Sequence, residues 1–178
     1  AIVFGSVAFG WKMWSEQANK DQIESKFADA MTRFHDEVER LRFVADSPHF
    51  FEFNRFEIWR YWDNRERILA RSLDLSPERQ EQVRADLLEV AFFLIDRDQE
   101  IISQAEACFG DDLVRRIREM EPESASPREL VIIAQRLLKA NQLHRAELVL
   151  RDVLRTQPDD FWSWFRLGQV QFRQEAFD

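Results

Sequence analysis

The chain has 178 residues and a formal charge of −8, with 45% hydrophobic residues, 33% charged residues, 4 Gly and 5 Pro. So few helix-breaking residues, combined with so many apolar and charged ones, favour long amphipathic helices, and we predict an all-α fold. The acidic balance provides no positive field for a polyphosphate, so we expect no nucleic-acid partner.

The residues with metal-binding or nucleophilic side chains are few and scattered. The single cysteine, Cys108, cannot form a disulfide within the chain and lies among apolar residues, so we expect a small core residue there. His35, His49 and His144 do not share a spacing typical of metal ligands. We therefore predict neither a metal nor a cofactor.

The first fourteen residues carry no charge before Lys12, and Trp11 and Trp14 flank that lysine. Eleven uncharged residues are about half of the roughly 20 that cross a bilayer, and tryptophans beside a lysine are typical of a membrane interface. We interpret residues 1–15 as the end of a transmembrane or anchoring helix. The lysines that follow favour the cytoplasmic side for the rest of the chain. The alternative is a helix buried in a globular domain or against another subunit.

Residues 16–46 read as one long amphipathic helix. Its apolar residues recur at alternating steps of four and three, which predicts a heptad seam of the coiled-coil type; they are Phe27, Met31, Phe34, Val38, Leu41 and Ala45. Charged residues between them predict a solvated opposite face, so the seam must pack against a partner, either within this chain or outside it.

Residues 47–121 are expected to form a helical bundle. Ser-Pro pairs at 47–48 and 76–77 each supply an N-cap followed by an N1 proline, which predicts a helix start. The aromatic stretch 50–62 is expected to pack in the core, or against a partner or a membrane surface. The run at residues 91–95 is apolar on all sides and should lie at the centre. Gly110 predicts a helix end, and a short helix at residues 113–120 precedes a polar linker at 121–126.

The strongest pattern begins at Ser126, which can cap a helix together with Glu129 three residues later. Counting Pro127 as the first position, the following residues match the large, small and terminating positions of a 34-residue helical repeat: Leu130, Ile133, Ala134, Leu137, Ala146, Leu150, Val153 and Pro158. A second unit opens 34 residues later at Phe161, with Trp164, Leu167 and Gly168 in the W-x-x-L-G positions.

Residues 127–178 therefore resemble the tetratricopeptide repeat family, with one complete unit and one partial unit. The resemblance implies stacked helix pairs that approach closely at Ala134, Ala146 and Gly168, with the preceding helices as a divergent cap. It also implies a groove, lined chiefly by the first helices, that binds peptides or partner proteins. The candidate contact residues on those helices are Arg128, Gln135, Arg136, Lys139, Trp162, Arg166 and Gln169.

A wider resemblance rests on the order of the segments: an anchor, a heptad helix, the stretch 76–95, and repeats that end in the aromatic stretch 161–165. This order is similar to the tail that follows the transmembrane helix in bacterial serine/threonine kinases with repeats. The kinase loop motifs are not in the sequence, so no kinase activity follows from it.

Two functional hypotheses stay open. The first is a membrane-tethered interaction scaffold, or an accessory subunit of a membrane complex, that binds protein partners. The second is the sensor or docking tail of a kinase whose catalytic domain lies outside this chain. We do not expect an enzyme, because the neighbouring acid and base residues, Asp111 with Asp112 and His35 with Asp36, diverge on a helix.

Overall fold

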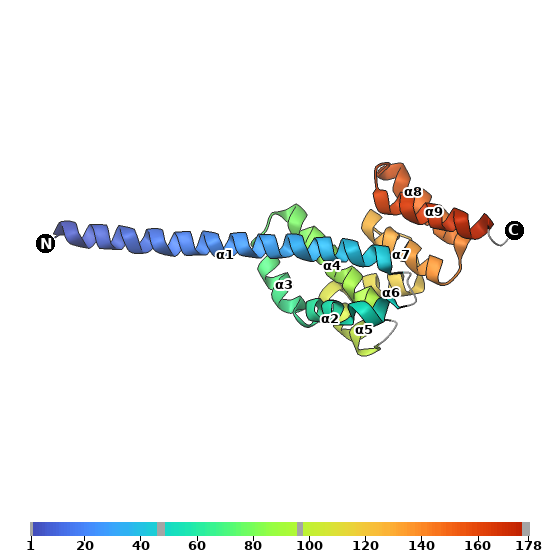
Figure 1. Ribbon diagram of the computed structural model, residues 1–178, viewed down its shortest axis with the longest axis horizontal. Coiled ribbons are helices and arrows are strands. Elements are labelled where there is room, and N and C mark those ends of the chain that lie inside the picture. The colour runs from blue at the N-terminus through green and yellow to red at the C-terminus, as the bar shows by residue number, and fades with distance from the viewer. Residues whose placement is uncertain (1, 46–48, 96–97, 176–178) are drawn as a thin grey trace.

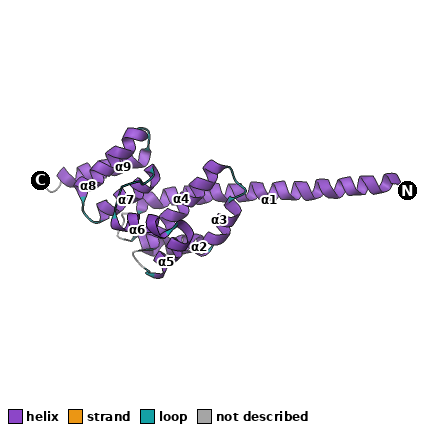
Figure 2. Cartoon of the chain, turned by 180° about the vertical axis from the view of Figure 1, so that it is seen from behind, coloured by secondary structure: helices purple, strands orange, loops and turns teal. Residues whose placement is uncertain are grey.

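The computed structural model describes residues 2–45, 49–95 and 98–175, with side chains described from Asp21 onward apart from Phe51. Within these residues the chain forms nine α-helices and no strand, joined by short loops (Figure 2). The prediction of an all-α fold is confirmed.

One helix, α1 (Ile2–Val44), runs through both N-terminal segments that the sequence separates at residue 15. It extends as a straight rod, and only its C-terminal half lies against the other helices (Figure 1). Residues 21–26 are exposed, whereas the seam from Phe27 to Ala45 is buried apart from the half-buried Met31. This seam packs against the chain's own α4 (Pro77–Leu94), so the heptad prediction is confirmed and the partner is internal.

The start of α1 is not supported as a membrane anchor. Among the residues that the structure describes, no helix contains a stretch both long and apolar enough to span a bilayer.

Two shorter helices, α2 (Phe50–Asp63) and α3 (Arg65–Ser72), connect α1 to α4. The start signal at Ser47 and Pro48 lies outside the described residues, and α2 begins just after it. In α4, Ser76 is the extended N-cap and Pro77 the first helical residue, as the sequence predicts.

The aromatic stretch in α2 is divided between the core and the surface. Phe50 and Trp62 are buried, and the Trp62 indole N–H donates to Gln104 Oε1 at 2.8 Å. Phe53 and Phe56 point to solvent, at 75% and 78% exposure. Part of this stretch therefore stabilises the bundle, and part forms an apolar surface.

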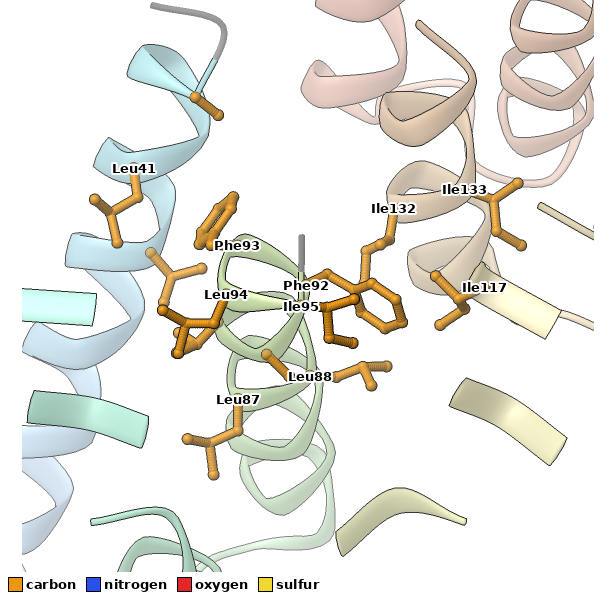
Figure 3. Close-up of a cluster of buried hydrophobic side chains, with 14 of the residues drawn as sticks. Leu41, Leu87, Leu88, Phe92, Phe93, Leu94, Ile95, Ile117, Ile132 and Ile133 are labelled. Carbon is orange, nitrogen blue, oxygen red and sulfur yellow. The ribbon is translucent and has the colours of Figure 1, made fainter. Parts of the chain in front are cut away.

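The centre of the molecule is α4, whose residues 86–94 are all buried, as is Ile95 directly after it. Figure 3 shows Phe92 reaching towards Ile132 of α7 (Pro127–Lys139) and Phe93 lying on the side of Leu41 of α1. Each such side chain contributes about 1.5–3 kcal/mol when it leaves water. The apolar run at 91–95 is thus central, as predicted, and α4 joins the N-terminal bundle to the C-terminal helices.

Helices α5 (Glu100–Phe109) and α6 (Asp111–Glu119) form a hairpin around Gly110, whose φ of 96° favours glycine. Cys108 is half-buried and packs against the core. The predicted capping box opens α7: the Glu129 N–H donates to Ser126 Oγ, and the Ser126 N–H donates to Glu129 Oε2. Helices α8 (Leu143–Thr156) and α9 (Phe161–Glu175) follow.

Candidate protein-interaction site

The three C-terminal helices stack side by side. α8 packs against both α7 and α9, and α7 also contacts α9. The small residues Ala134 and Ala146 are fully buried, as are the large residues Leu137 and Leu150. Small residues let two helix axes approach closely, and large ones fill the space beside the crossing. The pair α7–α8 is therefore a closed unit.

The beginning of α9 packs against the end of α1, more than a hundred residues earlier in the chain. The Trp162 indole N–H donates to the Glu39 carboxylate, and the Phe43 ring lies 4.5 Å from the Trp162 ring, centroid to centroid. Arg166 is 1% exposed and donates from Nη2 to the Arg42 carbonyl oxygen at 3.0 Å. This flank of α9 is covered by the chain itself.

The corresponding flank of α7 is covered by α4. Ile132 is buried near Phe92, and the Arg136 guanidinium lies 5.5 Å from the centre of the Phe92 ring. The first helices of both units thus face the chain's own α1 and α4 on the side where a groove was expected.

A buried network of charges holds α1, α4 and the repeat helices together. Arg42 donates from Nε to Glu89 Oε2 at 2.7 Å and also pairs with Glu39. Burial disfavours the charge of Arg42, but the attraction and hydrogen bond of Glu89 outweigh it, so the pKa of Arg42 is raised. Burial raises the pKa of Glu89, against the opposing effect of Arg42. The pair depends on both partners being present.

His35 joins this network through Asp86, which is fully buried on α4. His35 Nδ1 lies 2.9 Å from Asp86 Oδ2, and this hydrogen bond raises the pKa of His35. Asp86 Oδ1 accepts no hydrogen bond from the protein, but it lies 3.9 Å from Arg42 Nη2 and 3.8 Å from Arg128 Nη1. The network therefore connects three helices, α1, α4 and α7, through charged side chains.

Comparison with known families fixes the nature of the C-terminal stack. Residues 127–170 match the family model described as tetratricopeptide repeat. This segment is a tetratricopeptide repeat. Repeats of this family bind proteins, so the segment is a protein-interaction element. No curated protein and no solved structure matches the chain.

The structure separates the seven predicted contact residues of the tetratricopeptide repeat into two groups. Gln135, Trp162 and Arg166 are buried, at 6%, 7% and 1% exposure. Trp162 and Arg166 contact the end of α1, so the side chains of these two residues are covered by the chain itself. Four others keep exposed or half-exposed side chains with contacts of their own: Arg128, Arg136, Lys139 and Gln169.

Two predicted packing residues of the partial unit also differ from expectation. Trp164 is 55% exposed, and nothing lies within 4 Å of a Cβ built on Gly168. The close approach expected at Gly168 is not formed among the described residues. Together with Phe172 and with Phe161, whose half-exposed ring also lies 5.8 Å from the Phe43 ring of α1, these two residues form an exposed flank of α9, which we call the open flank. Leu167, on another face of α9, is buried, and Pro158 is exposed in the turn before α9.

Sequence reasoning missed the junction residues Arg42, Asp86 and Glu89. A signal for two of them exists: Asp86 and Glu89 lie three residues apart among the buried residues of α4, where a charge requires a partner. The open flank, by contrast, has no sequence signal that distinguishes it from the covered residues of α7, since its residue types are those of a packed repeat helix.

Proposed function

We propose that the chain is a protein-interaction scaffold, in which the tetratricopeptide repeat binds a partner protein through the open flank of α9. The observation that carries the proposal is an exposed row of large apolar residues on a repeat helix: Phe161, Trp164 and Phe172, at 55%, 55% and 74% exposure. Contiguous exposed aromatic surface is typical of protein-binding sites. The other face of the repeat is engaged with α1 and α4.

The test is affinity capture of cross-linked partners from the native cell, with the wild-type chain and two matched variants. One variant replaces Phe161, Trp164 and Phe172 by Ser, and the control replaces the exposed Phe53 and Phe56 of α2 by Ser. We expect the partners to be lost with the first variant and retained with the second. Equal recovery from all three chains would contradict the proposal.

We further propose that the scaffold belongs to a membrane complex and is tethered through residues 1–15, on the cytoplasmic side. The support is the sequence alone: an apolar run followed by Trp11, Lys12 and Trp14. Co-flotation with anionic lipid vesicles tests this. We expect the wild-type chain to float and a Trp11→Glu, Trp14→Glu variant to remain at the bottom. A wild-type chain that stays at the bottom would refute tethering by this segment.

The proposal includes no catalytic activity. His35 is held by the buried Asp86, and Asp112 pairs with Arg115 and Arg116 on the surface of α6. These pairings support a structural role for the residues that the sequence offered as acids and bases. The kinase-tail alternative gains no support from the fold or the comparisons, and we do not propose it.

A further inference from the structure

A cavity of about 150 Å³ lies where α1, α4 and α7 meet the start of α9. Its wall includes Glu39 of α1 and Trp162 of α9, whose indole N–H donates to the Glu39 carboxylate. The His35 imidazole lines the same cavity, one helical turn before Glu39. Because open space beside Glu39 lets its side chain change rotamer, the hydrogen bond to Trp162 depends on what holds the Glu39 carboxylate in place.

The two oxygens of the Glu39 carboxylate have different partners. Oε2 accepts from Trp162, whereas Oε1 pairs with Arg42 Nη1 and lies 3.8 Å from His35 Nε2. The contacts to Oε1 therefore fix the orientation in which Oε2 reaches α9. Glu39 is thus the link between His35 and the second repeat unit.

The contact from His35 to Glu39 depends on the protonation of the imidazole. A carboxylate only accepts, so Nδ1 is the donor in the 2.9 Å hydrogen bond to Asp86 Oδ2. In the neutral imidazole Nε2 then directs a lone pair towards Glu39 Oε1, which repels it. In the imidazolium Nε2 carries a proton and attracts Oε1. Only the protonated His35 therefore joins Asp86 of α4 to Glu39.

The charges around His35 favour its protonated form. Three carboxylates face two guanidiniums in the buried network, so a positive His35 brings their sum to zero. The hydrogen bond to Asp86 raises the pKa of His35, against burial and the charge of Arg128. The carboxylates are Asp86, Glu39 and Glu89, and the guanidiniums are Arg42 and Arg128. Further charged groups line this cavity or a second one that His35 borders: Arg79, Glu81, Arg84, Glu129 and Asp160.

We propose that His35 is a proton-linked positioning residue for α9. With its imidazole protonated, His35 holds Glu39 in the orientation that accepts the Trp162 N–H, and the start of α9 is fixed to α1. With its imidazole neutral, this hold is weakened and α9 is freer to move against α1. Because the pKa is raised, the hold is fully present below the ordinary value of about 6.5 and is lost as the pH rises through the folded value.

The coupling does not depend on the proposed function, because it concerns how α9 is placed whether or not a partner binds there. Its test follows the indole N–H signals of the full 178-residue chain by ¹⁵N–¹H NMR from about pH 5.5 to about pH 8.5. We expect the Trp162 signal to shift with the same midpoint as the His35 ring protons. The Trp164 signal should stay constant, since its N–H donates to the Pro158 carbonyl oxygen.

Three variants identify the group that titrates and the route of its effect. His35→Gln should remove the Trp162 shift, and His144→Gln, at an exposed position of α8, should retain it. Glu39→Gln keeps an acceptor oxygen for Trp162 and removes the charge that the imidazolium attracts. In that chain His35 should still titrate beside Asp86, while Trp162 loses most of its shift. A circular dichroism melt checks that each variant is folded.

Spin labels measure the movement of α9 itself. The exposed residues Arg33 of α1 and Gln171 of α9 are replaced by labelled cysteines in a Cys108→Ser chain, and double electron–electron resonance gives the distance between the labels. We expect a narrow distribution at about pH 5.5 and a broader one at about pH 8.5, with no such difference after His35→Gln. The inference falls if the wild-type distribution is the same at both pH values, if the Trp162 signal does not follow His35, or if Glu39→Gln leaves the Trp162 shift unchanged.

Discussion

Helices α7 and α9 occupy the same place in successive units of one repeat, yet they have different surroundings. α7 is enclosed by α4, α6 and α8. α9 is covered by α8 on one side and by the end of α1 on another, and its third side is open. The repeat pattern therefore specifies a helix with several apolar faces, and the neighbouring helices determine which of these faces are buried.

One pair of equivalent positions shows how α9 is adapted to α1. Ile132 in α7 and Arg166 in α9 lie 34 residues apart, and both are buried. The isoleucine faces the apolar Phe92, whereas the arginine donates to the Arg42 carbonyl. At each position the residue type suits the helix that covers it: an apolar residue faces α4, and a hydrogen-bond donor faces α1. The sequence of α9 is therefore adapted to its contact with α1.

The largest effect is expected from a variant that disrupts the buried contacts between α1 and α4, on the side of the repeat that the chain itself covers. Replacing Arg42 by Met leaves the Glu89 carboxylate buried without its cation, which should lower the free energy of unfolding by about 3–5 kcal/mol. The measurement is urea denaturation followed by circular dichroism.

The matched control is Arg155→Met, which removes an exposed ion pair with Asp152 and should cost less than about 1 kcal/mol. The double variant Arg42→Met, Glu89→Leu should recover much of the lost stability, because the Glu89 carboxylate is then removed together with its cation and Asp86 keeps His35 and Arg128 as neighbours. Equal destabilisation by the Arg42 and Arg155 variants would show that the junction is not a buried network.

A smaller effect is expected when the equivalent small residues of the two units, Ala134 and Gly168, are each replaced by leucine. Ala134→Leu adds three carbon atoms to a side chain that is fully buried where two helices cross. It should lower the free energy of unfolding by about 1–3 kcal/mol. Gly168→Leu should instead stabilise the chain by about 0.5–1 kcal/mol, since an exposed helix glycine is unfavourable and the space is open. Thermal melts of the two single variants check the sign. A destabilising Gly168→Leu would mean that the flank is not open.

The smallest effect concerns the pH dependence of the junction. The hydrogen bond to Asp86 raises the pKa of His35, with support from the charges of Asp86 and Glu39 and against burial and Arg128. A raised pKa in the folded state contributes stability that is fully present below the unfolded value of about 6.5 and is lost as the pH rises through the folded value.

The difference in unfolding free energy between wild type and His35→Gln should therefore shrink as the pH is raised from about 5.5 to about 8.5. Solvent limits its size, because the His35 side chain is 24% exposed. His144→Gln, on the exposed face of α8, is the control. If the difference in unfolding free energy stayed constant or grew with pH, the His35–Asp86 hydrogen bond would not contribute to stability as proposed.

Local patterns in the sequence predicted much of the fold. The heptad seam of α1, the start of α4, the end at Gly110 and the capping box at Ser126 each depend on residues within one or two turns, so periodicity and caps reveal them. The 34-residue register was visible because the second unit repeats the residue types of the first at the same positions.

The candidate site was predicted less well, because it depends on contacts between distant segments. Arg166 and Arg42 are 124 residues apart in the chain, and no local spacing indicates that they meet. For this reason Trp162 and Arg166 looked like groove residues, and Gly168 looked like a packed one. Which face of a repeat helix stays open is decided by the elements that happen to cover it.

The most direct test of this account is a comparison of Trp162 and Trp164 in the intact chain. Incorporation of 5-fluorotryptophan gives each indole a ¹⁹F signal, which single Trp→Phe variants assign. We predict that the Trp164 signal shifts when H₂O is replaced by D₂O and that the Trp162 signal does not, because α1 covers only the latter. Equal solvent shifts for the two residues would contradict the separation of α9 into a covered side and an open flank.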